Sequence, residues 1–199
     1  MNLFNHNRLE QTTAPTEWPV DVDECKAHMR LPSNLTSQDG MIQVLIETAT
    51  GWAEDYSGRQ FMNATWEATW NHFPAFLNLP QPPFSSLTTF TYVDTTGTTT
   101  TVSSSIYQIV SDKNRAYIQE AYDQSWPSAR PQSEAIKVTW VAGYGAVGRA
   151  VPAKFRQAIL ILVSTLYEQP DLVVTGMTAG EVPFSAKQLL GTDRIYAGV

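Results

Sequence analysis

Apolar residues recur at helical spacing in two parts of the chain. The clearer part runs from residue 42 to residue 56, where the apolar positions share one face and Glu47 and Asp55 lie on the other. Gly58 suits the left-handed residue that ends such a helix. Earlier, Asp21 and Glu24 have the spacing of a reciprocal capping box. We therefore predict helices over residues 21–30, 38–57 and 152–168.

Between the second and third helices the period of the pattern changes to two. Met62, Ala64, Trp66, Ala68 and Trp70 alternate with polar residues, as in a half-buried strand. Further strands are predicted over residues 86–92, 98–103, 107–110, 115–120 and 135–142, with a turn at residues 94–97. The fold class is therefore predicted as α+β, with a helical core of three main helices and an antiparallel β region inserted over about residues 61–142.

The two ends of the chain have a different character from its middle. Residues 1–19 are polar and show no period, so they are interpreted as an N-terminal arm. Residues 20–169 form the predicted domain. Residues 170–199 contain one short helical candidate at residues 184–190 and are interpreted as a C-terminal docking arm, ordered mainly when it is docked.

The last long helix is apolar on more than one side. Phe155, Ile159 and Leu162 lie on one face, and Leu160, Ile161 and Tyr167 extend the apolar surface beyond it. A small domain has little interior to surround such a helix. We expect either the β region or another subunit to cover it, which makes Leu160, Ile161 and Tyr167 candidates for a subunit interface.

Composition limits the classes of partner. Only 16% of the 199 residues are charged, below the usual quarter, so part of the surface is expected to face partners. The net charge of −6 excludes retention of DNA by a general excess of Lys and Arg, but it permits a surface past which DNA slides. The first 20 residues lack the order of a signal peptide and residues 158–163 are too few to cross a bilayer, so we expect a soluble protein.

The sequence offers little catalytic chemistry. The three histidines lie in different segments without metal-ligand spacing, and the single cysteine, Cys25, excludes an internal disulfide framework. Cys25 and His28 lack an orienting third group. Residues 143–148 match G-x-G-x-x-G but follow an antiparallel region, so they are interpreted as a flexible joint. We predict no metal, no cofactor and no enzymatic activity.

The order of these segments is more informative than any one of them. Its parts are the capped helix with residues 24–30, the helix end at residues 53–59, the Trp-bearing strand, the Leu79–Pro83 connector, the strand edge at residues 92–94, residues 141–145, residues 151–152, the aliphatic helix ending at Glu168, and Leu189, Leu190 and Arg194. This order resembles the head–tail connector (adaptor) proteins of tailed phages, in their gp6-like and phiE125-type group, which also occur in gene transfer agents. The resemblance covers about residues 19–195.

The resemblance implies a structural role. Such adaptors form a ring, usually of twelve copies, below the portal protein at the capsid vertex, and they extend the DNA channel toward a stopper or tail-completion protein. It implies a place in the virion neck, assembly in the host cytoplasm, passage of DNA without specific binding, and no membrane. Because the C-terminal segment of the family reaches the portal, it also implies portal anchors at Phe184, Leu189, Leu190 and Arg194.

Several alternatives stay open at this point. Glu47, Glu54 and Asp55 are candidates for residues that line the channel. Arg59 is expected either to cap carbonyls or pair with an acid such as Glu54, or to reach the neighbouring subunit as an interface residue. Many family members have an Arg-Glu pair after the long helix, where this chain has Gln169, Pro170 and Asp171. This difference predicts that the chain turns more sharply from the helix into the C-terminal arm. An aromatic, Thr-rich β region also fits a receptor- or carbohydrate-binding tail module.

Overall fold

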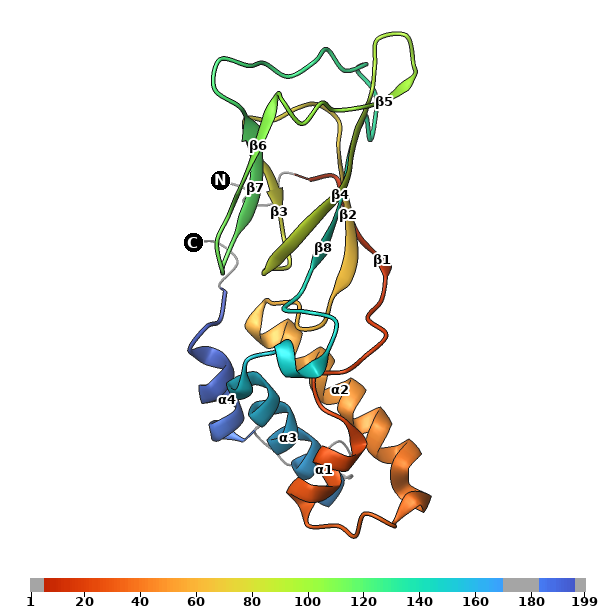
Figure 1. Cartoon of the computed structure of the whole chain (residues 1–199), viewed down its shortest axis with the longest axis vertical. Coiled ribbons are helices and arrows are strands. Elements are labelled where there is room, and N and C mark those ends of the chain that lie inside the picture. The colour runs from red at the N-terminus through yellow and green to blue at the C-terminus, as the bar shows by residue number, and fades with distance from the viewer. Residues whose placement is uncertain (1–5, 170–182, 196–199) are drawn as a thin grey trace, which may run out of the picture. The chain divides into compact units, whose positions relative to one another are not determined.

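A computed structural model describes residues 6–169 and 183–195 of the chain (Figure 1). The predicted α+β class is confirmed, with helices and antiparallel sheets in two compact units. The helical unit contains the described residues of 16–62 and 145–195, and the β unit contains those of 1–15 and 63–144. The β unit is thus interrupted in sequence by the first two helices and ends before the third.

The helical unit contains four α-helices rather than the three main helices that were predicted. Their bounds are α1 (Val22–Met29), α2 (Asp39–Ser57), α3 (Ala153–Glu168) and α4 (Phe184–Gly191), with two short 3₁₀ helices, η1 (Thr36–Gln38) and η2 (Gly148–Ala150). The first three agree with the predicted ranges to within one residue at either end. The fourth is the short helical candidate of the predicted C-terminal arm, and it packs against α3 and α2.

The helix ends follow from local chemistry. The Asp21 carboxylate accepts from the Glu24 backbone N–H at 2.7 Å, and the Glu24 carboxylate accepts from the Asp21 backbone N–H at 3.3 Å, so the predicted capping box forms. Gly58 ends α2 with φ of 67°, a value that costs glycine little. Pro152 is the N-cap of α3, one position before the first-turn position that its missing N–H favours.

The core of the helical unit is built on α3. Its predicted buried face is present, and α1, α2 and α4 all pack against the helix. Phe155 stacks on Phe61 with the ring centroids 5.0 Å apart. Side chains from α2 and α4 complete this core, namely Ile42, Ile46, Ala49, Ala53, Ala186 and Leu190. The helical unit therefore covers most of its own apolar helix.

The β unit consists of two antiparallel sheets. The five-stranded sheet has the order β1 (Arg8–Thr13), β2 (Ala64–Trp70), β8 (Ile136–Ala142), β4 (Phe84–Val93) and β5 (Thr99–Thr101). The three-stranded sheet has the order β3 (Leu77–Leu79), β7 (Ala116–Glu120) and β6 (Tyr107–Ser111). The predicted turn after β4 also forms, because Gly97 N–H donates to the Asp94 carbonyl at 2.9 Å.

Strand β1 was not predicted from the sequence. It lies within residues 1–19, which were interpreted as an arm, and it pairs along β2 from Arg8 opposite Thr69 to Thr13 opposite Thr65. Its residues are exposed apart from half-buried Leu9, so it carries no alternation of apolar and polar positions. Backbone pairing and the ion pair of Arg8 with Glu67 hold it, and neither leaves a hydrophobic period.

One hydrophobic core joins the two sheets of the β unit. Phe90, Val138 and Trp140 from the five-stranded sheet share it with Leu77 and Ile118 from the three-stranded sheet. Aromatic side chains close one end of this core. They are Phe73, which stacks on Trp126 with ring centroids 4.9 Å apart, and Tyr92 and Tyr107, which pack edge-on or tilted around Phe73 and Phe90.

Candidate interaction surfaces

The extra apolar residues of α3 are only half-buried. Leu160 and Ile161 are partly covered, and the Tyr167 hydroxyl donates a hydrogen bond to the Gln38 side-chain carbonyl. From the sequence we expected either the β region or another subunit to cover this helix. In the structure, α1, α2 and α4 of the same unit pack on it. Residues 184–190 were interpreted as part of a C-terminal arm that is ordered mainly when docked. The sequence therefore did not predict that this segment packs on α3. Leu160 and Ile161 keep some surface for a partner.

Arg59 lies inside its own unit. Its side chain is 1% exposed, and its Nε donates to the backbone carbonyl of Asp193 at 2.7 Å. Of the two roles that the sequence left open, this contact is the intramolecular one. The carbonyl belongs to the chain just after α4, however, and not to Glu54 or to the end of α2. A side chain so buried offers a neighbouring subunit almost no surface.

The four predicted portal anchors have different surroundings. Leu190 is fully buried in the helical core and Leu189 is half-buried. The Arg194 guanidinium lies over the Tyr56 ring, 4.4 Å from its centroid. Phe184 is 79% exposed. Two of the anchors therefore hold α4 to its own unit, and Phe184 keeps the largest free surface of the four. The rest of the predicted arm, residues 170–182 and 196–199, lies outside the described residues.

The three predicted channel acids differ in their exposure to solvent. Glu47 and Asp55 are exposed on α2. Glu54 is half-buried and accepts from the Phe61 backbone N–H at 2.7 Å and from the Gln60 amide at 2.8 Å. Burial raises the pKa of Glu54 to about 7 against the lowering effect of the Phe61 hydrogen bond. The Glu54 carboxylate therefore accepts hydrogen bonds from the turn after α2. Only Glu47 and Asp55 have the exposure that a channel wall requires.

Large apolar side chains are exposed at two places on the helices of the helical unit. Met41 is 49% and Val44 57% exposed on α2, and Phe184 is 79% exposed on α4. Val44 could have been recognised from the sequence, because it falls outside the apolar face that runs from Ile42 to Tyr56. These three side chains are the large exposed apolar residues of the described helices, and they are available for contact with a partner.

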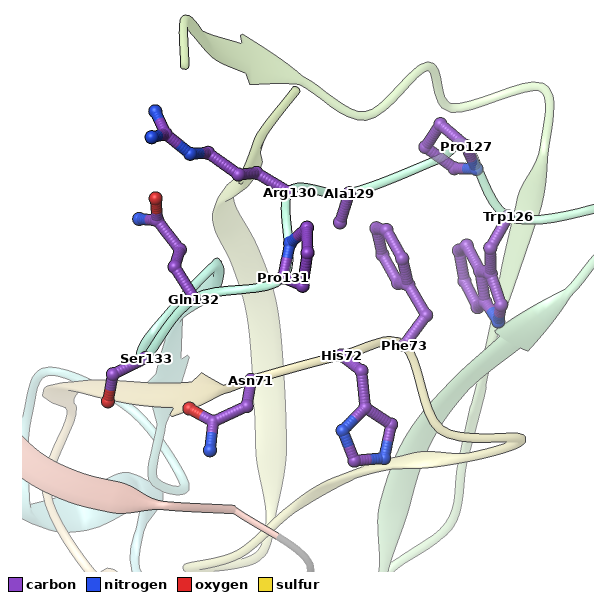
Figure 2. A pocket seen from close by; sticks show the side chains of 10 residues that line it. All are labelled: Asn71, His72, Phe73, Trp126, Pro127, Ala129, Arg130, Pro131, Gln132 and Ser133. Carbon is purple, nitrogen blue, oxygen red and sulfur yellow. The ribbon is translucent and has the colours of Figure 1, made fainter. Parts of the chain in front are cut away.

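The β unit carries one open pocket of about 590 Å³ (Figure 2). Phe73 and Trp126 stack against one another on one side of it, and Arg130 and Gln132 extend from the loop on the other. The remaining lining residues are Asn71, His72, Pro127, Ala129, Pro131 and Ser133. The Phe73 ring covers one face of the Trp126 indole, and Trp126 is half-buried.

Other kinds of site were also sought among residues 6–169 and 183–195. In these ranges no group of three His, Cys, Asp or Glu side chains is arranged to hold a metal ion. The same residues contain no helix that is long and apolar enough to span a membrane.

Comparison with known proteins agrees with this geometry. The family model described as phage gp6-like head-tail connector protein matches residues 19–89, which include α1, α2 and the first strands of the β unit after β1. The chain resembles gp6-like head–tail connectors, as predicted. No curated protein sequence matches the chain.

Three solved structures share the fold over nearly the whole chain. A chain of the "neck of empty GTA particle computed with C6 symmetry" is 24% identical, with a TM-score of 0.77, and the match covers 95% of this chain and 96% of that one. A chain of the "virion of native gene transfer agent (GTA) particle" is 23% identical, with a TM-score of 0.74 and coverage of 94% and 95%. A chain of the "neck of native GTA particle computed with C12 symmetry" is 21% identical, with a TM-score of 0.71 and coverage of 95% and 96%.

The connector resemblance falls on only some of the candidate surfaces. The family-matched segment contains Met41, Val44, Glu47 and Arg59, whereas α3 and α4 lie beyond it. The likeness to the solved neck chains extends over both units and so includes the helical surface that α4 presents. Both the α2 surface and the α4 surface thus belong to the fold that the chain shares with those neck chains.

Proposed function

We propose that this protein is a structural subunit of the head–tail connector in a virion neck. The observation that carries the proposal is the match of 95% of the chain to a neck chain at a TM-score of 0.77, together with the connector family match at residues 19–89. The role is one of joining and spacing, and it requires no catalytic group. Nothing in the comparisons supports a receptor- or carbohydrate-binding tail module.

The proposed assembly is a closed ring of identical copies. The neck structures that share the fold were computed with sixfold and twelvefold cyclic symmetry, which supports several copies around one axis and suits a ring of twelve. In a cyclic ring each copy contacts its two neighbours through two different surfaces. A subunit of this kind needs complementary surfaces on opposite sides.

We further propose that the ring extends a DNA channel between the portal protein and a stopper or tail-completion protein. The net charge of −6 supports passage without retention, because each phosphate that a wall neutralises adds affinity for the duplex. Glu47 and Asp55 are the two channel candidates that are exposed. Contact with the portal is assigned to the C-terminal segment, residues 170–199.

Localisation in assembled particles tests this function. The loop after β7 suits an epitope insertion, because Tyr122 is 97% exposed there. An antibody against the epitope is expected to label particles between the capsid vertex and the tail, and class averages are expected to show a ring at the labelled level. Label at the tail tip would favour the receptor-binding alternative, and protein absent from particles would contradict both functions.

A further inference from the structure

One side of α4 combines an exposed aromatic ring with a half-buried cation. Phe184 is 79% exposed at the first turn, and Lys187 follows three residues later, which places both side chains on adjacent positions of the helix surface. Within the described residues the Lys187 ammonium group has no ion-pair or hydrogen-bond partner. We call Phe184 and Lys187 the α4 patch.

The exposed face of α2 has the complementary pattern. Met41 and Val44 are 49% and 57% exposed, and Glu47 follows Val44 at the same three-residue spacing. The Glu47 carboxylate accepts one hydrogen bond, from the Gln43 amide of its own helix at 3.2 Å, and no cation lies beside it among the residues that the structure describes. We call Met41, Val44 and Glu47 the α2 patch.

The two patches lie on different helices of the helical unit. Helices α2 and α4 both pack against α3 and also contact each other. The contacts of Asp193 and Arg194 lie at the C-terminal end of α2, with Arg59 and Tyr56, whereas the α2 patch lies in the N-terminal half of that helix. Two surfaces that leave each other free within one copy can meet between neighbouring copies around an axis. This is the arrangement that a head-to-tail contact needs, since such a contact uses two different surfaces of each subunit.

We propose that the α4 patch of one copy binds the α2 patch of the next copy. In this contact Phe184 covers Met41 and Val44, and Lys187 pairs with Glu47. The inference rests on the proposed ring function and names the surfaces that would close the ring. It also assigns Glu47 to a subunit contact rather than to the channel wall, whereas Asp55, two turns further along α2, stays free for the channel.

The choice of a second copy as the partner of Phe184 follows from the chain's own surface. The chain itself carries an acceptor with the right chemistry, because apolar side chains and a carboxylate recur at the same spacing as the aromatic ring and the ammonium group. One aromatic side chain and one exposed ion pair give a weak contact in a pair of copies. Repetition around a closed ring, where each copy is held on both sides, makes such a contact sufficient.

Cross-linking of full-length protein tests the contact without requiring a stable ring. Thr48→Cys and Gln188→Cys variants, exposed one turn from Val44 and from Phe184, keep both patches intact and are made singly and as a double variant. Each is treated with a short bis-maleimide at high protein concentration. A head-to-tail contact is expected to give a ladder beyond the dimer for the double variant. A mixture of the two single variants is expected to give one dimer that contains both chains. Tyr122→Cys, which lies in the β unit, measures cross-linking by collision alone.

Charge reversal then tests the pairing of Lys187 with Glu47. In the double-cysteine background, Lys187→Glu or Glu47→Lys alone is expected to lower the yield of the ladder by about two- to fivefold, as for an exposed ion pair. Combining the two reversals is expected to restore it. Rescue of this kind distinguishes a direct pairing from a general effect of net charge.

Three results would overturn the inference. One is a double-cysteine ladder no stronger than the Tyr122→Cys background, and another is cross-linking of each single variant to itself, which indicates a two-fold contact. The third is a Phe184→Ala protein that still forms rings in particles but no longer joins the portal, which would assign Phe184 to the portal. In each case labelled protein in the neck would leave the proposed function standing.

Discussion

The Arg59 side chain donates from Nε to the backbone carbonyl of Asp193 across 134 residues of sequence, at 2.7 Å. Arg59 follows the glycine that ends α2, and Asp193 lies just after α4. The Asp193 carboxylate in turn pairs with Lys154 in the first turn of α3. One cluster therefore joins the ends of three helices, and it makes α4 part of the folded unit.

Replacing Arg59 should therefore loosen α4. We expect Arg59→Met to lower the free energy of unfolding by about 2–4 kcal/mol, because it removes a buried charge-assisted donor and leaves its partners unpaired. Urea unfolding followed by tryptophan fluorescence measures the loss. Limited proteolysis of the same variant should show earlier cleavage near α4 than in the wild-type protein.

Arg149→Met provides the matched control for Arg59. Arg149 is exposed in η2 and has no partner among residues 6–169 and 183–195, so its replacement should change the free energy of unfolding by less than about 0.5 kcal/mol. Equal losses for the two variants would show that the bond from Arg59 to Asp193 does not hold α4 in place.

The thiol of Cys25 should be unreactive in the folded protein. Cys25 is 1% exposed, and burial raises its pKa to about 12, with the Asp21 and Glu24 carboxylates adding to the rise. At pH 8 we expect iodoacetamide to modify it about 1,000-fold more slowly than in denaturing urea. Mass spectrometry of timed samples measures the rate. Modification of folded Cys25 as fast as a cysteine at the exposed position of Tyr122 would contradict the buried placement.

Gly148 should not accept a side chain. A Cβ atom there would lie 2.7 Å from the Pro19 carbonyl oxygen and 2.8 Å from that of Trp18, and backbone atoms cannot easily withdraw. We expect Gly148→Ala to lower the free energy of unfolding by about 1–3 kcal/mol through overpacking. Gly51→Ala is the control, since nothing lies within 4 Å of its added Cβ atom and alanine favours a helix. A Gly148→Ala protein as stable as wild type would contradict this close approach.

The local signals in the sequence were sufficient for most elements. The capping box of Asp21 and Glu24, the αL glycine at Gly58 and the turn after β4 depend on residues within a few positions of one another, and all three form as predicted. The alternation around Trp66 likewise gave β2. Such features are readable because neighbouring residues alone determine them.

Contacts between residues far apart in the chain could not be predicted from the sequence pattern. Strand β1 is held by pairing with β2, about 60 residues away, so nothing in its own pattern marks it. Only two residues of α4, Ala186 and Leu190, are buried, and this is too short a pattern to mark a helix face. Helix α3, against which α4 packs, ends well before it in the sequence. The same reason applies to Arg59, whose acceptor is 134 residues away.

The candidate surfaces were only partly predictable. The sequence selected Phe184 and Glu47, which the structure exposes, but also Leu190, which it buries, and Glu54, which it half-buries. A carboxylate on the polar face of a helix is normally solvated. Glu54 differs because the chain turns back over it after Gly58 and presents the Phe61 backbone N–H to it. Only the path of the chain after the helix reveals this burial.

Glu54 gives the helical unit a pH-sensitive group. Its folded pKa of about 7 lies above the ordinary value of 4.5, chiefly because burial disfavours the charged form, and the Asp55 carboxylate adds to the rise. The folded state therefore holds a proton that the unfolded state releases between these two values. Its contribution to stability is full below about pH 4.5 and is lost as the pH rises through 7.

We therefore expect the free energy of unfolding to fall between pH 5 and pH 8 in the wild-type protein, with up to about 3 kcal/mol of the change due to Glu54. Glu54→Gln keeps an acceptor for the Phe61 N–H but cannot ionise, so its stability should vary less with pH and should exceed that of the wild type at pH 8. Urea unfolding at intervals of half a pH unit measures both curves. Asp55→Asn, at the exposed neighbouring position, is the control and should retain most of the slope. Parallel curves for wild type and Glu54→Gln would show that Glu54 is ionised throughout this range in the folded protein.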